Sequence, residues 1–139
     1  MEINITCGQY ANDYYSNTLN GIFIPFNEAM IQGNIKYPLF EEEFIEERIK
    51  SLNTNKEEYL NKLNGIISLK EIIHNIKIIN CYFGEDEFCK VNVYYLFKYL
   101  MQLNYNNKII LNIIDETTYE IKNTVPINCI KTYIETCGL

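Results

Sequence analysis

Arginine and tryptophan are almost missing from this 139-residue chain: Arg48 is its single arginine, and it has no tryptophan. The formal net charge is −6. Proteins that bind duplex DNA or RNA need a basic surface, and arginine is the side chain that holds phosphate best. The composition therefore argues against direct nucleic acid binding. The excess of acids is explained most simply by solubility.

The sequence also lacks segments that would take the chain into or across a membrane. No apolar run approaches the roughly 18 to 20 residues that a spanning helix requires, so we expect no membrane partner. The first ten residues, MEINITCGQY, contain no basic residue and do not resemble a secretory signal. Five cysteines without regular spacing, an odd number, predict free thiols and a cytoplasmic location.

Motifs for cofactors and metals are missing as well. The segment TCGQYAN, after the first predicted strand, does not match the glycine pattern of dinucleotide-binding folds, and no Gly-Lys-Ser/Thr phosphate loop occurs. Cys81 and Cys89 are farther apart in sequence than the cysteines of common zinc pairs, which are about two to four residues apart. We therefore expect no cofactor and no metal.

Nucleophilic chemistry has little support from the sequence. Cys7 follows a predicted strand, where a nucleophile would fit, but no histidine or basic residue is near it in sequence to lower its pKa. A small buried residue is the simpler interpretation. His74, the only histidine, precedes the third predicted strand, which puts it at the amino edge of the sheet, away from a ligand site.

The residues that are present predict an α/β fold. Hydrophobic residues make up 47% of the chain, enough for one domain with a core over 1–139. Isoleucine-rich and alternating segments predict strands at roughly 2–7, 22–25, 76–83 and 108–114. The last two are almost continuously apolar, as central parallel strands covered on both faces are.

Helical patterns occupy the intervals between these strands. An apolar helix at roughly 87–103 joins the third and fourth strands in a crossover that is right-handed by default. Capping boxes at 54–57 and 68–71 predict two helix starts, and Gly65 is expected to end the first of these helices. The tail is expected to add a short strand and a closing helix. The predicted class is a Rossmann-like, three-layer α/β domain with a small, mainly parallel sheet of four or five strands.

Ligands of open α/β sheets bind beyond the carboxyl ends of the strands, where the strand order reverses. Four corners follow the four predicted strands, and parallel strands would bring them to one edge of the sheet. The candidate ligand-binding residues in these corners are Gly8, Asn27, Glu28, Gly84, Glu85, Asp86 and Asp115. The sequence assigns no catalytic residue.

The corner after the third strand, FGEDEFC, is open to two interpretations. In the structural one, Gly84 allows a tight turn, Asp86 caps the following helix, and Glu87 favours the positive end of its dipole. Glu85 has no such duty, since a cap needs one acid. In the functional one, Glu85 or Asp86 is a general base or a hydrogen-bond acceptor for a polar ligand.

Two segments carry motifs of a known family. FNEAMIQGNI, residues 26–35, resembles a family pattern with Phe26, Glu28, Ala29, Gly33 and Ile35 at its fixed positions. YFGEDEFCKVN, residues 82–92, resembles a second pattern, in which an aromatic residue is followed by FGED, FC and Asn. The resemblance is to domain-of-unknown-function family 1835, a bacterial family often labelled as AraC-type regulators, and it covers most of residues 3–121. It implies a compact Rossmann-like domain and no established activity. The AraC label does not suit a chain without a basic surface or paired helix-turn-helix motifs.

Three functions remain open. The first is a cytosolic bacterial α/β domain that binds a small molecule or regulates through it; frequent Ile, Asn, Lys and Tyr, as in AT-rich genomes, favour a bacterial or phage source. The second is a small enzyme, a hydrolase or a proton-transfer catalyst, that uses two carboxylates such as Glu28 and Glu85. The third is an acidic interaction or inhibitor protein, such as a phage counter-defence factor, with a protein partner or a homodimer.

Overall fold

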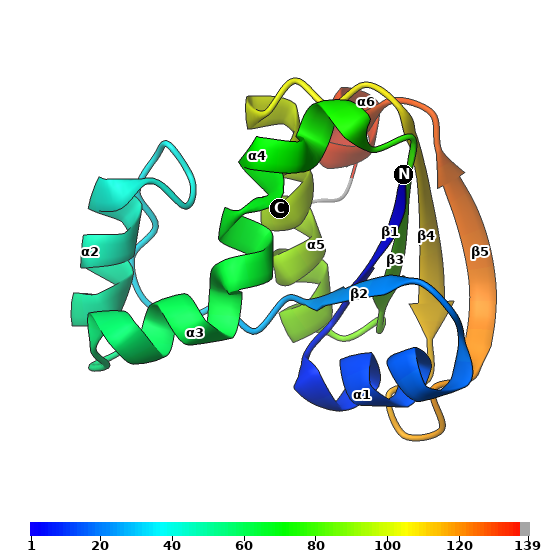
Figure 1. Cartoon of the computed structure of the whole chain (residues 1–139), viewed down its shortest axis with the longest axis horizontal. Coiled ribbons are helices and arrows are strands. Elements are labelled where there is room, and N and C mark those ends of the chain that lie inside the picture. The colour runs from blue at the N-terminus through cyan, green and yellow to red at the C-terminus, as the bar shows by residue number, and fades with distance from the viewer. Residues whose placement is uncertain (137–139) are drawn as a thin grey trace.

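Residues 1–136, which the computed structural model describes, form a five-stranded sheet flanked by helices (Figure 1). The strand order is β2-β1-β3-β4-β5. Strands β1 to β4 are parallel to one another, and β5 is antiparallel to β4. The strands are β1 (Glu2–Thr6), β2 (Ile22–Pro25), β3 (Ile78–Phe83), β4 (Lys108–Ile114) and β5 (Ile121–Ile127). The predicted fold class and the four predicted strands are confirmed.

Helices connect these strands. They are α1 (Gln9–Thr18), α2 (Glu42–Ser51), α3 (Lys56–Ile67), α4 (Leu69–Ile72), the short 3-10 helix η1 (Ile73–Asn75), α5 (Glu87–Gln102) and α6 (Ile130–Thr136). The crossover through α5 joins two parallel neighbours, β3 and β4, as predicted. The closing strand and helix are also present. The end of the chain, from Cys137, lies outside the described residues.

The two faces of the sheet are covered unequally. The register pairs Ile5 with Cys81 and Cys81 with Leu111, and this face belongs to the main core with α3 and α5. On the other face, Tyr15 of α1 stacks on Tyr82 with ring centroids 4.6 Å apart. That second face also carries Asn4, Asn80 and Asn112. These asparagines interrupt the isoleucine runs, so the second face of β3 and β4 is covered but less apolar than the first.

Helix ends depart from the sequence prediction at two places. Gly65 lies inside α3 and does not end it, because the helix packs on β2 there: a Cβ at Gly65 would lie 2.7 Å from the Ile24 side chain. Tertiary packing overrides the low helix propensity of glycine at this position. The cap of α3 is Asn55, whose Oδ1 accepts from the Glu58 amide at 2.9 Å, and the capping box was predicted one residue too early. The Ser68 side chain makes no cap hydrogen bond.

The thiols and the helix lengths bear on two further predictions. Cys7, Cys81, Cys89 and Cys129 are free thiols in the structure. Cys81 is completely buried within the sheet, and burial raises the pKa of its thiol. Among residues 1–136, every helix is too short or too polar to cross a membrane.

Candidate functional site

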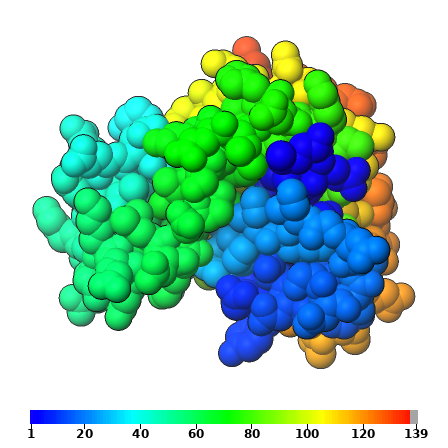
Figure 2. Space-filling model, viewed as in Figure 1, coloured from blue at the N-terminus to red at the C-terminus, as the bar shows by residue number. Residues whose placement is uncertain are grey.

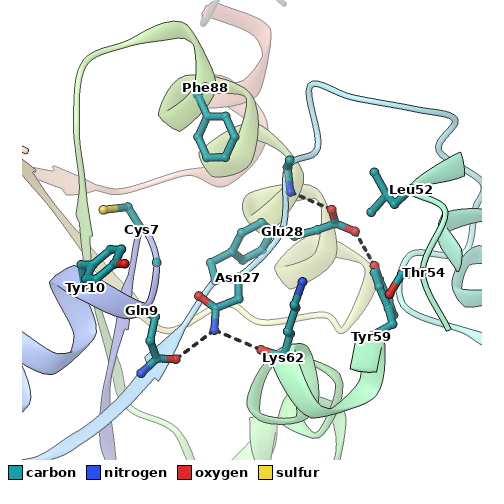
Figure 3. A pocket seen from close by; sticks show the side chains of 13 residues that line it. Cys7, Gln9, Tyr10, Asn27, Glu28, Leu52, Thr54, Tyr59, Lys62 and Phe88 are labelled. Carbon is teal, nitrogen blue, oxygen red and sulfur yellow. Dashed lines mark hydrogen bonds between the residues drawn. The ribbon is translucent and has the colours of Figure 1, made fainter. Parts of the chain in front are cut away.

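A cleft of about 840 Å³ opens at the carboxyl ends of β1 and β2. Figure 2 shows a hollow on the lower edge of the molecule, between the α2–α3 segment (cyan to green) and the α1 segment (blue). Residues after β1 and β2 meet residues of α3 and α5 around this space (Figure 3). The residues that line the cleft are Cys7, Gly8, Gln9, Tyr10, Phe26, Asn27, Glu28, Ala29, Leu52, Thr54, Tyr59, Lys62 and Phe88.

Glu28 lies in the wall of this cleft, but its carboxylate is fully bonded. Oε1 accepts from Nη2 of Arg48 at 2.8 Å and from the Ala29 amide at 2.7 Å. Oε2 accepts from Nε of Arg48 at 2.9 Å and from the Tyr59 hydroxyl. Burial and the neighbouring Glu28 carboxylate raise the pKa of Tyr59, so this hydroxyl keeps its proton. Each carboxylate oxygen thus has two donors, which leaves Glu28 without capacity for proton transfer or ligand binding.

The same group of side chains anchors the loop that follows β2. Arg48, with 0% of its surface exposed, also donates to the backbone carbonyls of Gln32 (2.6 Å), Asn34 (3.0 Å) and Ala29 (3.0 Å). From the other side, Nδ2 of Asn92 in α5 donates to the Glu28 carbonyl at 2.8 Å. Glu28, Arg48 and Tyr59, the Glu28 group, therefore fix one wall of the cleft.

Other polar groups of the cleft have bonding capacity left. Lys62 reaches into the space from α3 (Figure 3), and its ammonium makes no ion pair within the described part of the chain. Asn27 donates to Oε1 of Gln9 at 3.1 Å, which leaves its own Oδ1 as an acceptor. Above Gly8 there is open space, since the nearest atom to a Cβ there would be Asn27 Oδ1 at 4.0 Å. Phe88, which is 41% exposed, adds an aromatic surface.

A second hollow, of about 220 Å³, adjoins the cleft and shares five lining residues with it: Cys7, Gly8, Gln9, Tyr10 and Phe88. At this hollow two cysteines and an acid meet from three separate corners. The sulfur atoms of Cys7 and Cys89 and a carboxylate oxygen of Glu116 all lie within 4.8 Å of one another. The Cys89 thiol donates to Oε1 of Glu116 at 2.6 Å. We call Cys7, Cys89 and Glu116 the thiol cluster.

Proton sharing makes the two thiols unequal. Interaction with the neighbouring Cys89 thiol lowers the pKa of Cys7, and the interaction with Cys7 together with burial raises the pKa of Cys89. Burial and a hydrogen bond with Asp86 raise the pKa of Glu116. Burial opposes ionisation of Asp86, but hydrogen bonds with Glu116 and the Cys89 amide outweigh it and lower the pKa of Asp86. Cys7 is thus the more acidic thiol, and Asp86 the more acidic carboxyl.

The corner after β3 supports this cluster. A Cβ at Gly84 would lie 2.2 Å from Oε1 of Glu116, so the glycine is required for the close approach of that side chain. Asp86 caps α5 as predicted, with Oδ1 accepting from the Cys89 amide at 2.9 Å. Glu85 points elsewhere and forms an ion pair with Lys122 of β5 at 2.7 Å.

The seven candidate residues thus fall into three sets. Gly8, Asn27 and Glu28 line the cleft. Gly84 and Asp86 lie beside the thiol cluster. Glu85 and Asp115 line neither space; Oδ1 of Asp115 instead accepts from the Thr117 and Thr118 amides at 2.8 and 3.0 Å, and these bonds lower its pKa.

Several residues at these sites were not predicted from the sequence. Lys62 and Tyr59 belong to α3, and no motif in the sequence connects this helix with the edge of the sheet. Glu116 lies in a predicted corner, but nothing in the sequence distinguishes it from its neighbours. Cys81 is the cysteine nearest to Cys89 in sequence, whereas Cys7 is the one that lies beside it in the structure. Only the strand order, which brings β1 beside β3, reveals that pairing.

Comparison of the chain with family models, with curated proteins and with solved structures finds no match.

Proposed function

We propose that this α/β domain binds a small organic molecule carrying an anionic or strongly polar group, in the cleft at the carboxyl ends of β1 and β2. The observation that carries the proposal is a cleft of about 840 Å³ into which Lys62 brings an ammonium without an ion-pair partner among residues 1–136. The cleft also lies at the edge where α/β sheets generally bind ligands. Its volume is in the range of small-molecule sites.

Each type of side chain in the cleft has a part in this proposal. Lys62 pairs with the charged or polar group of the ligand. Asn27 and Gln9 provide amide hydrogen bonds that fix its orientation. Phe88 and Leu52 cover the apolar part, and Gly8 leaves room for it. A mainly apolar wall with a few polar groups is the usual composition of small-molecule sites.

A binding domain is better supported than an enzyme that uses Glu28 and Glu85. The Glu28 carboxylate is saturated by four donors, so it has no free lone pair for a proton. Glu85 lines neither the cleft nor the smaller hollow and is paired with Lys122. General acid and base catalysis requires groups within hydrogen-bond reach of the reacting atoms.

We also propose that the chain is a distant relative of domain-of-unknown-function family 1835. The two motif segments meet in the structure, since Asn92 of the second bonds to the Glu28 carbonyl of the first. Other motif residues are buried, including Phe26, Phe83 and Cys89. Residues with such joint structural duties are the ones that a shared fold would keep, which supports the relationship without assigning a function.

A thermal-shift screen against pools of nucleotides, sugar phosphates and organic acids tests the binding proposal. We expect at least one anionic compound to raise the melting temperature. Lys62→Met should weaken the affinity for that compound by about tenfold, the equivalent of about 1.4 kcal/mol. Lys56→Met, which removes the same charge from an exposed position of the same helix, is the matched control and should leave it unchanged. Equal effects of the two substitutions, or no stabilising compound, would contradict the proposal.

A further inference from the structure

We propose that Cys7, Cys89 and Glu116 bind one thiophilic divalent metal ion, with zinc as the best match. The three donor atoms lie within 4.8 Å of one another although they come from separate segments: the end of β1, the start of α5 and the turn after β4. This site adjoins the Lys62 cleft, with which it shares Cys7, but none of the proposed ligand contacts involves the metal, so the inference goes beyond the proposed function.

The chemistry of the donors selects the metal. Two thiolates and a carboxylate are ligands that zinc accepts, whereas magnesium and calcium take oxygen ligands almost exclusively. With Zn–S distances of about 2.3 Å and Zn–O distances of about 2.1 Å, tetrahedral ligands lie about 3.5 to 3.8 Å from one another. The sulfur of Cys89 and Oε1 of Glu116, now 2.6 Å apart, would separate by about 1 Å. The exposed Glu116 side chain has the freedom to move this far.

The surroundings hold these donors in place. The Cys7 amide donates to the Tyr82 carbonyl at 3.0 Å, which ties the end of β1 to β3. The Cys89 amide donates to the Asp86 cap, and the Cys89 side chain is only 2% exposed. Gly84 leaves the space that Glu116 occupies. Orientation of metal ligands by neighbouring hydrogen bonds is a general feature of protein metal sites.

Three protein ligands leave a fourth tetrahedral position open. Zinc sites with three protein ligands and one open position are typical of centres that bind water or an external ligand. Here the three ligands line the 220 Å³ hollow that adjoins the larger cleft through Cys7. A metal ion at this point would therefore face solvent and the cleft.

Titration of the reduced full-length chain with Co²⁺, which substitutes spectroscopically for zinc, tests the site. We expect one equivalent to bind, with a thiolate-to-cobalt charge-transfer band and the visible absorption of tetrahedral cobalt, and Zn²⁺ to displace it. Absence of the charge-transfer band would overturn the proposal. So would oxidation of Cys7 and Cys89 to a disulfide in a chain that binds no metal when reduced, because the two thiols would then be a redox pair.

Substitutions locate the metal. Cys7→Ser and Cys89→Ser should each weaken Co²⁺ binding by at least about 100-fold, the upper end of what loss of a supporting residue costs. Glu116→Gln should weaken binding by about 10- to 100-fold and keep the thiolate band. Cys129→Ser, at an exposed position, is the control and should bind like the wild type. An unchanged charge-transfer band in Cys7→Ser would overturn the proposal, even if Cys89→Ser does not fold. Loss of this band in Cys129→Ser would overturn it as well.

Discussion

Two groups of ionisable side chains lie near the same edge of the sheet, and they differ in how much bonding capacity they have left. In the Glu28 group every carboxylate lone pair has a donor, and Arg48 makes five hydrogen bonds. In the thiol cluster, sulfur and carboxylate atoms face one another and a hollow. Position at the edge of a sheet thus does not by itself identify a functional acid, because Glu28 lies there with every carboxylate lone pair bonded.

The Glu28 group has a structural function. Burying an ion pair removes two charges from water, and the attraction between them seldom gains much more than this desolvation costs. The value of the Glu28 group therefore lies in geometry: it holds the loop after β2 against α2, α3 and α5. That loop forms a wall of the cleft, so the fully bonded Glu28 group lies directly beside the space proposed for the ligand.

Removal of Arg48 should have the largest effect on stability. Arg48→Met leaves the Glu28 carboxylate buried without its cation, which we expect to lower the free energy of unfolding by about 3–5 kcal/mol. Lys50→Met on the exposed side of the same helix is the control and should change it by less than about 0.5 kcal/mol. Urea unfolding measures both. A loss below about 1 kcal/mol for Arg48→Met would mean that the group is not a scaffold.

Gly84→Val tests how tightly the corner after β3 packs against the thiol cluster. The new side chain would occupy the position of the Glu116 carboxylate and force that exposed side chain to rotate away, and we expect a stability loss of about 1–2 kcal/mol. Urea unfolding gives the loss, and Co²⁺ titration should show weaker binding. Wild-type stability together with wild-type Co²⁺ binding would show that Glu116 does not depend on the space above Gly84.

A smaller effect is expected at the cap of α5. Asp86→Ala removes the acceptor for the Cys89 amide and should lower stability by about 1 kcal/mol. Asp86→Asn keeps an equally good cap and separates the hydrogen bond from the charge. We expect Asp86→Asn to recover most of the loss in thermal unfolding. Equal losses in the two variants would assign the effect to charge.

Glu85 should have the smallest effect. Its ion pair with Lys122 is exposed at both ends, so Glu85→Ala should change stability by less than about 0.5 kcal/mol. Because Glu85 lines neither space, compound binding in the thermal-shift assay should also be unchanged. Loss of binding in this variant would move the ligand site to the corner after β3.

The architecture was predictable because strands and helices follow from local hydrophobic patterns. The two isoleucine-rich strands and the helix between them are where the pattern put them. The lower apolarity of the second face was not predictable, because Asn80 and Asn112 read as single polar residues within two almost continuous apolar segments. The cap at Asp86 was found because capping is a local contact.

The candidate site was only partly predictable. Gly8, Asn27 and Glu28 were placed at the cleft by topology, but the saturation of Glu28 depends on Arg48 and Tyr59, which come from two other helices. The meeting of Cys7 and Cys89 depends on β1 lying beside β3. Contacts between distant segments leave no spacing in the sequence by which they can be recognised.

The most direct test of the division into a closed scaffold and an open site compares Arg48→Met with Glu116→Gln. Unfolding free energies are measured with a chelator and with Zn²⁺ at about 100 times its dissociation constant, where binding adds about 2.7 kcal/mol. We predict that Arg48→Met lowers stability in both conditions and keeps the zinc increment. Glu116→Gln should match the wild type in chelator and lose about half of the zinc increment or more at the same Zn²⁺ concentration. A Glu116→Gln variant that is as unstable as Arg48→Met in chelator, or that keeps the full zinc increment, would contradict the account.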